Sequence, residues 1–279
     1  MKKLMGVSKI KIEDITDQYI DKVFYHNNLA GYKEAYPSLF EHYFTFWGDR
    51  NAFTKTLTSQ EVREKVFLIK HFLPAIEKKL GEYGFEIEHL KIVLLVGQSS
   101  TNGHAFLDND KFVVWIPIEL YTTELQVKMF LTHEIIHAIH YKYNRDYYFY
   151  SSEEKQNSLR QLITEGVATY ITKILMNVSE ADALWAGFLT KEGVEDWMNE
   201  CERNKNEICK KILSREHLRG LFEANKSNDI FNFRAGYYLG LKIITSVVCN
   251  KNLSLVELIM LPKKELDNIV KNELQRCIY

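Results

Sequence analysis

The sequence predicts an α+β fold that is mostly α-helical, with a small mixed sheet in the middle of the chain. Only residues 90–96 and 111–117 combine β-branched and aromatic side chains as strands do. The segments on either side repeat apolar residues at helical spacing. With 279 residues, 46% of them hydrophobic, the chain can bury a full core as one domain or two closely packed ones. We expect a helical N-terminal region over residues 1–85 and a second, closely packed region over residues 86–279.

Three helices are expected in the N-terminal region, near residues 13–28, 33–46 and 59–80. Pro74 falls inside the third and is expected to kink it, and Gly81 and Gly84 are expected to end it. Six aromatic residues between positions 36 and 47 form a cluster that we assign to core packing rather than to a ligand site.

The two predicted strands are joined by a polar loop over residues 97–106. The loop lacks the Gly-Lys-Ser/Thr ending of a P-loop and no helix follows it, so a phosphate site is not expected. His104, alone in this loop, is expected to be exposed. Pro117 cannot donate a ladder hydrogen bond, which favours a position at or near the sheet edge for residues 111–117.

The next helix, predicted over residues 123–143, carries the main functional motif. Thr123 can cap its start, and no glycine or proline interrupts it. His133 and His137 lie four residues apart on one helical face, so both can bind one metal ion, and Glu134 can reach a water molecule there without being a ligand. The alternative is a buried amphipathic helix with two hydrogen-bonded histidines, in which burial of Glu134 without a metal or partner would be costly.

A catalytic zinc ion needs a third protein ligand, and the candidates differ in their setting. The third histidine of a metzincin would fall at position 143, which is Tyr143. Asp146 lies in a tyrosine-rich loop with no motif around it. Glu153 and Glu154 follow two serines and resemble the acidic start of a helix.

Glu165 is the preferred third ligand. It lies on a predicted amphipathic helix over residues 158–176, beside the small residues Gly166 and Ala168. A glycine inside a helix costs about 1 kcal/mol relative to alanine, so we expect Gly166 and Ala168 to permit the close approach that this helix and the helix with His133 and His137 need to reach one ion. The alternative is an exposed glutamate on an ordinary helix. Towards the C-terminus, a capping box at Ser254 predicts a short helix, and residues 263–275 are expected to form the last one.

Together these motifs resemble those of the gluzincin metallopeptidases, most closely the small bacterial predicted zinc-dependent proteases. The resemblance rests on the His-Glu-x-x-His motif at 133–137, Glu-Gly-x-Ala-x-Tyr at 165–170 and Tyr-x-x-Gly at 237–240. It implies a zincin-like core, one zinc ion bound by His133, His137 and Glu165, and a tyrosine, Tyr237, that stabilises the tetrahedral intermediate. The Gly-x-Met-Glu-Asn segment of the related aminopeptidases is absent, so no aminopeptidase is implied.

The predicted reaction is zinc-dependent hydrolysis of a peptide bond. Glu134 would act as the general base, and zinc and Tyr237 would stabilise the oxyanion. Tyr238 and Arg234 are alternatives to Tyr237, and His140 either orients a ligand or is an ordinary polar helix position. A zinc-stabilised binding or scaffold module is a competing function, which Glu134 argues against, and a zinc hydrolase of non-peptide substrates is another.

Composition bounds the partners and the compartment. A net charge of −1 with interspersed charges gives no basic surface for nucleic acid or an anionic membrane. Charged residues interrupt the N-terminus where a signal peptide would be apolar, no apolar run is long enough to span a membrane, and the four cysteines have no metal-site spacing. We expect a cytoplasmic protein that acts on a peptide or protein, with its oligomeric state undetermined.

Overall fold

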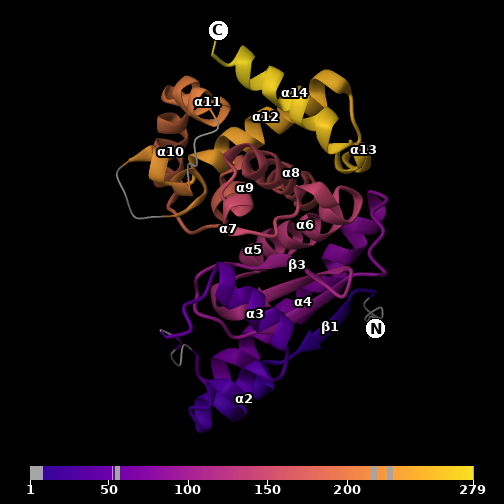
Figure 1. Ribbon diagram of the computed structural model, residues 1–279, viewed down its shortest axis with the longest axis vertical. Helices are drawn as coiled ribbons and strands as arrows, with labels where there is room; N and C mark the ends of the chain where they lie inside the picture. The colour runs from indigo at the N-terminus through magenta and orange to yellow at the C-terminus, as the bar shows by residue number, and fades with distance from the viewer. Residues whose placement is uncertain (1–8, 52, 54–56, 215–218, 225–228, 279) are drawn as a thin grey trace. The chain divides into compact units, whose positions relative to one another are not determined.

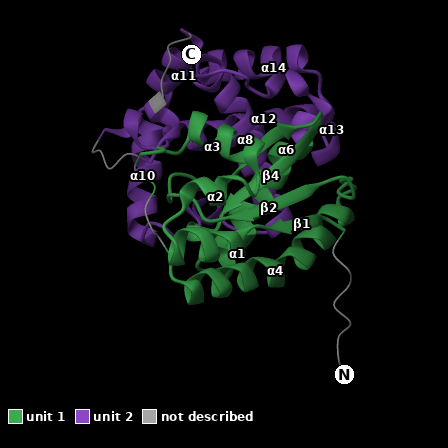
Figure 2. Ribbon diagram, turned by 60° about the horizontal axis from the view of Figure 1, so that its bottom comes forward, with its two compact units in different colours: residues 1–139 green, residues 140–279 purple. Residues whose placement is uncertain are grey.

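The computed structural model describes residues 9–51, 53, 57–214, 219–224 and 229–278 (Figure 1). The chain divides into two compact units, residues 1–139 and 140–279 (Figure 2). The first unit contains one four-stranded mixed sheet, and helices dominate the described residues of both units. The predicted fold class, α+β and mostly α, is therefore confirmed.

The sheet of the first unit has the strand order β1-β2-β4-β3. β1 and β4 both pair in parallel with β2, and β3 pairs antiparallel with β4. The elements of this unit, in chain order, are β1 (Lys11–Asp14), α1 (Thr16–Gln18), the π-helix η1 (Tyr19–Tyr25), α2 (Leu29–Lys33), α3 (Pro37–Phe46), α4 (Ser59–Glu82), β2 (Lys91–Leu95), β3 (His104–Asp108), β4 (Lys111–Pro117), the 3₁₀-helix η2 (Ile118–Leu120), α5 (Glu124–Gln126), the π-helix η3 (Val127–Leu131) and the start of α6 (Thr132–Tyr143).

Two strands were not predicted, and each has a local reason. β1 is rich in charged residues and carries no strand signal of its own; it forms by pairing with the buried strand β2. β3 occupies residues that the sequence assigned to a loop. Asn109 and Asp110 both have positive φ, 47° and 63°, and join β3 to β4 as a two-residue hairpin turn.

Residues 111–117 form β4, which lies next to the edge strand β3 and pairs with β2 on its other side, so the strand is near the sheet edge, as predicted, but not at it. The register explains how Pro117 is tolerated. Pairing with β3 ends where Trp115 faces His104, so Pro117 has a neighbour only on the β2 side, where it faces Leu95. The missing N–H of Pro117 therefore costs no hydrogen bond on the β3 side.

The predicted N-terminal helices are present with more interruptions than expected. Residues 13–28 hold the end of β1 followed by α1 and η1, and residues 33–46 include the end of α2 and all of α3. The third helix, α4, continues through Pro74 to Glu82, and Gly84 follows it with a φ of 85°. The predicted aromatic core is confirmed at Phe40 and Tyr43, which are buried.

The helix predicted over residues 123–143 is one helical run with a π-turn inside it. Thr123 caps its start, since its side chain accepts a hydrogen bond from the Gln126 N–H at 3.2 Å. α5 continues as η3 and then as α6, which carries the His-Glu-x-x-His motif. π-turns of this kind occur often at functional sites.

The second unit is built from helices throughout its described residues. Its elements are the end of α6, the 3₁₀-helix η4 (Arg145–Tyr147), α7 (Ser152–Lys155), α8 (Ser158–Met176), α9 (Glu180–Trp185), α10 (Lys191–Arg203), α11 (Lys205–Leu213), the 3₁₀-helices η5 (Arg219–Phe222) and η6 (Ile230–Asn232), α12 (Ala235–Lys251), α13 (Leu255–Met260) and α14 (Lys263–Arg276). α8 has the predicted bounds, and α14 exceeds its predicted end by one residue. None of the described helices is long and apolar enough to cross a membrane.

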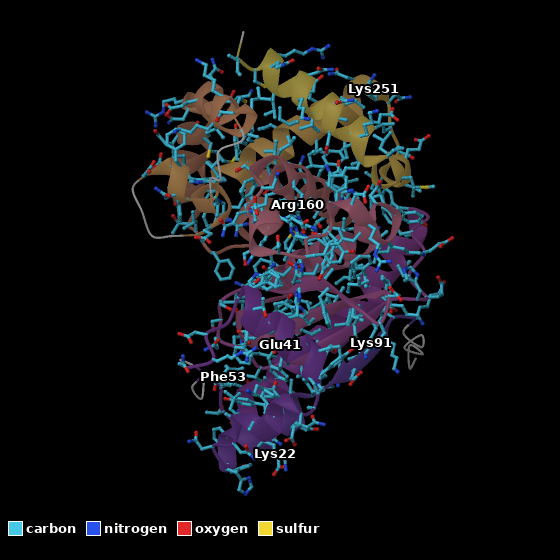
Figure 3. All side chains as sticks on the ribbon, viewed as in Figure 1. Lys22, Glu41, Phe53, Lys91, Arg160 and Lys251 are labelled. Carbon is cyan, nitrogen blue, oxygen red and sulfur yellow. The ribbon has the colours of Figure 1, made fainter. Side chains whose placement is uncertain are left out.

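Arg160, which is labelled in Figure 3, lies on α8 and forms hydrogen bonds with the segment that precedes this helix. Its buried guanidinium donates to the carbonyl oxygens of Tyr147, Glu154 and Lys155 at 3.0, 3.0 and 3.1 Å. Asn157 caps α8 by accepting a hydrogen bond from the Arg160 N–H at 2.9 Å. These bonds fix the start of the helix that carries Glu165.

The first unit also buries a carboxyl group, that of Glu119 on η2, which is 8% exposed. One oxygen, Oε1, accepts a weak hydrogen bond from the Ser99 N–H at 3.4 Å, and the other, Oε2, has no hydrogen-bond partner among the described residues. Burial raises the pKa of Glu119 to about 7, because the charged form loses its hydration. Hydrogen bonds from the backbone of Glu119, Ser99 and Gly97 lower the pKa in part, and the charge of Lys65 lowers it least.

We predict that Glu119→Gln changes how stability depends on pH. Because the folded pKa lies above the ordinary value of 4.5, the stabilising contribution of the neutral carboxyl is complete below about pH 4.5 and is lost as the pH rises through about 7. The melting temperature of Glu119→Gln, compared with that of the wild type, should therefore increase as the pH is raised from 5 to 8. The corresponding change in the free energy of unfolding is up to roughly 3 kcal/mol. The exposed Glu64→Gln serves as the control. If the difference in melting temperature between Glu119→Gln and the wild type does not change with pH, the raised pKa of Glu119 is contradicted.

Candidate metal centre

The two histidines of the motif point their ring nitrogens at each other. α6 holds His133 half-buried and His137 buried, and their Nε2 atoms lie 3.0 Å apart. Two nitrogen ligands of one tetrahedral zinc ion lie about 3.3 Å apart. The 3.0 Å separation is a hydrogen-bond distance, as the alternative of two hydrogen-bonded histidines requires, and it is also close to the spacing of two ligands of a shared zinc ion.

One carboxylate completes a possible ligand set. Among the described residues, a single group of three or more His, Cys, Asp or Glu side chains brings its ligand atoms within 4.8 Å of one another, and it consists of His133, His137 and Glu165. Two imidazole nitrogens and one carboxylate oxygen suit zinc and leave one position of a tetrahedron open, as in catalytic sites. The residues fit the metal that the sequence predicts.

The other acidic candidates lie elsewhere. Asp146, Glu153 and Glu154 are exposed and do not belong to that group. The Glu154 carboxylate accepts a hydrogen bond from the Tyr150 N–H at 2.6 Å, and its own N–H donates to the Ser151 hydroxyl at 3.2 Å. Glu154 therefore serves the start of α7, as its sequence context predicted.

A glycine contact explains how α8 carries Glu165 next to a second helix. A Cβ atom added to Gly166 would lie 2.7 Å from the Gly240 carbonyl oxygen, and one added to Gly240 would lie 2.8 Å from the Leu162 carbonyl oxygen. The backbones of α8 and α12 thus touch at this point, and no larger residue fits at either glycine. The sequence linked Gly166 to the approach of the helix that carries His133 and His137, but the nearest backbone at Gly166 is that of α12, the helix with the Tyr-x-x-Gly motif.

The three candidates for oxyanion stabilisation have different surroundings. Tyr238 is buried and its hydroxyl donates to the Glu202 carboxylate at 2.8 Å. The Arg234 guanidinium lies over two rings, 4.1 Å from the centre of Tyr237 and 5.1 Å from that of Trp185, and donates to the carbonyl oxygen of Leu184. Tyr237 is half-buried, one turn before Gly240. The bond to Glu202 makes Tyr238 the weaker of the two tyrosine candidates.

Two further histidines, His140 and His104, are both buried, although the sequence allowed an ordinary polar helix position for His140 and predicted an exposed one for His104. His140 is fully buried on α6, with its ring centre 4.8 Å from that of Tyr147. The expected exposure of His104 is wrong, because it is 7% exposed and its ring centre lies 4.5 Å from that of Trp47. His104 begins β3, and strand pairing with β4 carries it into the aromatic core of the first unit.

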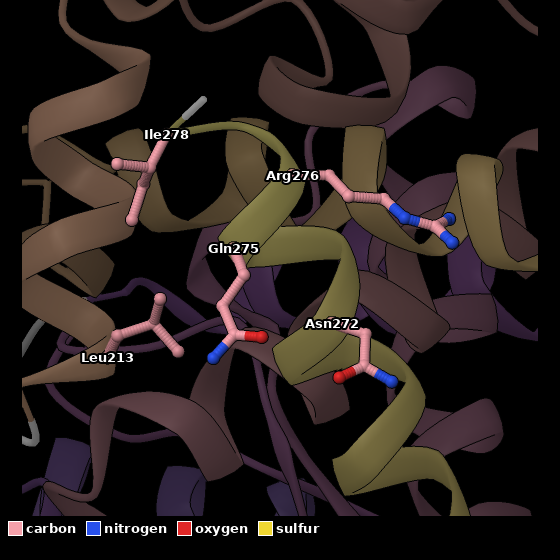
Figure 4. Close-up of a pocket in the computed structure, with 5 residues that line it drawn as sticks. All are labelled: Leu213, Asn272, Gln275, Arg276 and Ile278. Carbon is pink, nitrogen blue, oxygen red and sulfur yellow. The ribbon is translucent and has the colours of Figure 1, made fainter.

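A cavity in the second unit lies apart from the candidate metal ligands. It measures about 730 Å³ and is lined by Leu213, Asn272, Gln275, Arg276 and Ile278 (Figure 4). Its one charged side chain, Arg276, forms an ion pair with Glu273 at 2.6 Å. None of the candidate metal ligands contributes to this lining, so the cavity has no part in the proposed chemistry.

Comparison with known proteins agrees with the chemistry of the site. Residues 85–268 match a family described as predicted Zn-dependent protease (DUF2268). The matched segment is more than half of the chain and includes His133, Glu134, His137, Glu165 and Tyr237. Neither the curated proteins nor the solved structures provide a match. The chain belongs to the DUF2268 family of predicted Zn-dependent proteases.

Proposed function

We propose that the protein is a zinc-dependent peptidase in which His133, His137 and Glu165 bind one zinc ion per chain. The observation that carries the proposal is the group of three ligand atoms within 4.8 Å of one another. Glu134, 4% exposed, follows His133 directly on the same helix and is not one of the three. A structural zinc site normally has four protein ligands and needs no adjacent base, so this arrangement supports catalysis.

The residues divide the chemistry between them. Zinc, when bound, makes water easier to deprotonate and polarises a carbonyl group. Glu134 accepts a proton from the attacking water molecule while the water oxygen forms a bond to the carbonyl carbon. Glu134 then returns that proton to the nitrogen of the leaving amine when the C–N bond breaks. Glu134 therefore ends each cycle as the carboxylate with which it began.

Tyr237 is the proposed donor to the oxyanion. Its hydroxyl would donate a hydrogen bond to the carbonyl oxygen as negative charge develops there. The Arg234 guanidinium, 4.1 Å from the ring centre, supports the ring by a cation–π contact. Arg234 is thus assigned to positioning Tyr237, although it was an alternative donor at the level of sequence.

The substrate class is tested by cleavage of a peptide library. The zinc-loaded protein should cleave peptides, a chelator should abolish cleavage, and stoichiometric zinc should restore it. The proposed substrate is a peptide or protein, since a net charge of −1 provides no attraction for nucleic acid or an anionic membrane. If the protein binds zinc and cleaves no peptide, the peptidase assignment is wrong and a binding module or a hydrolase of other substrates replaces it.

We predict that the protein purifies with about one zinc ion per chain and that Glu165→Ala lowers zinc affinity by roughly tenfold or more, because one of three ligands is lost. Asp146→Ala and Glu153→Ala are matched controls and should leave the affinity nearly unchanged. Competition with a chromophoric chelator measures all of these affinities. Loss of zinc in Asp146→Ala alone would reassign the third ligand.

We predict that Glu134→Gln keeps its zinc and loses turnover, because the amide preserves the shape of the side chain but cannot accept a proton. A reduction of kcat by at least about a hundredfold is expected. Metal analysis of the same preparation separates loss of the base from loss of zinc. Native activity in the zinc-loaded variant would show that Glu134 is not the base.

We predict that Tyr237→Phe lowers kcat by roughly ten- to a thousandfold with little change in KM or zinc content, because the lost hydrogen bond forms only in the transition state. Tyr238→Phe should instead cost about 1 kcal/mol of stability through its lost bond to Glu202, with kcat nearly unchanged. Steady-state kinetics well below the melting temperatures compare the two. The reverse pattern would assign the role to Tyr238.

A further inference from the structure

The loop over residues 97–103, between β2 and β3, is held in place by bonds along its length. The Tyr121 hydroxyl donates to the Asn102 carbonyl oxygen at 2.7 Å. Gln98 exchanges two side-chain hydrogen bonds with the backbone of Asp49, at 2.8 and 2.9 Å. The loop is therefore a fixed surface, although the sequence identified it only as a polar connection.

At its end, the loop brings the backbone of Gly103 against the side chain of Glu134. A Cβ atom built on Gly103 would lie 2.8 Å from Glu134 Cγ, 2.9 Å from Ile116 Cδ1 and 3.0 Å from the Trp115 carbonyl oxygen. Gly103 also has a φ of 153°, a conformation that residues with a side chain rarely adopt. No other residue fits at position 103 without displacing a neighbour or the loop.

Tyr121 supports the same arrangement from inside the unit. It is fully buried, and its pKa is raised well above the ordinary value, first by burial and also by the negative charge of Glu134. The Tyr121 hydroxyl fixes the Asn102 carbonyl oxygen. This bond holds the chain at Asn102, so the backbone of the next residue, Gly103, stays in contact with Glu134.

We propose that Gly103 is a positioning residue, whose bare backbone, fixed by Tyr121 through Asn102, sets the side-chain conformation of Glu134. The consequence for catalysis rests on the proposed function, because it requires that Glu134 is the general base. Proton transfer depends on the distance to the acceptor, and a displacement of about 1 Å can cost roughly a hundredfold in rate. The packing contact itself exists whether or not the protein is a peptidase.

A double-mutant cycle on thermal stability tests the contact without any substrate. Gly103→Ala should lower the melting temperature by roughly 3–10 °C, because its Cβ overlaps three neighbours. In the Glu134→Ala background one of these neighbours, Cγ, is gone, and the loss should be smaller by roughly 2 °C or more. In the Glu134→Gln background Cγ remains, so Gly103→Ala should lower the melting temperature by as much as it does in the wild type. Equal losses in all three backgrounds would overturn the proposal.

Gly31→Ala is the control within the same unit. A Cβ atom there would lie 2.7 Å from the Asn28 side chain, and the atoms nearest to it belong to Asn28 and Lys22. It should therefore change the melting temperature equally whether residue 134 carries its native side chain or the Glu134→Ala change. A background-dependent loss for this control as well would attribute the effect to Glu134 substitutions in general, and would overturn the specific role of Gly103.

Kinetics then test the effect on the base. On a peptide that the wild type cleaves, Gly103→Ala should lower kcat by roughly ten- to a hundredfold and leave KM within about twofold and zinc content unchanged. Thermal coupling without a loss of kcat would overturn the positioning role. If the wild type cleaves no peptide, the proposed function fails, whereas the stability cycle still decides whether Gly103 constrains Glu134.

Discussion

The backbone contact between α8 and α12 is the constraint on which the positions of Glu165 and Tyr237 depend. Gly166 and Gly240 meet there, so neither helix can move outward without losing packing or inward without a clash. Glu165 precedes the first glycine, and Tyr237 lies one turn before the second. The contact therefore fixes together the helix with the proposed carboxylate ligand and the helix with the proposed oxyanion donor. It also brings together two motifs that lie some seventy residues apart in the sequence.

In the first unit, one helix carries the two histidines and Glu134, and one loop contacts Glu134. α6 sets the two histidine nitrogens 3.0 Å apart, and the Gly103 backbone limits the room available to Glu134. Glu119 and Glu134 are both buried carboxyl groups of this unit. Glu119 faces the interior of the first unit, where its charge is poorly compensated and its pKa rises to about 7. Glu134 directly follows His133, one of the proposed zinc ligands, on α6. One fold thus gives two buried acids different chemical settings.

The sequence predicted the elements whose signals are local. α8 has the predicted bounds because an N-cap at Asn157 and an unbroken apolar pattern define it. The histidine pair on α6 could be predicted because residues four apart share a helical face. β1, β3 and the burial of His104 could not, since they depend on pairing with strands distant in the sequence or across the Asn109–Asp110 turn. The role inferred for Gly103 likewise requires the positions of its neighbours, which no sequence pattern contains.

The most direct test of the account is X-ray absorption spectroscopy of the zinc-loaded protein. The account predicts about one zinc ion per chain with a nitrogen and oxygen first shell at about 2.0–2.1 Å, multiple scattering from two imidazoles, and no sulfur neighbour. Glu165→Ala should lose an oxygen neighbour and keep both imidazoles. A sulfur neighbour, fewer than two imidazoles, or a protein that binds no zinc would contradict the metal centre formed by His133, His137 and Glu165.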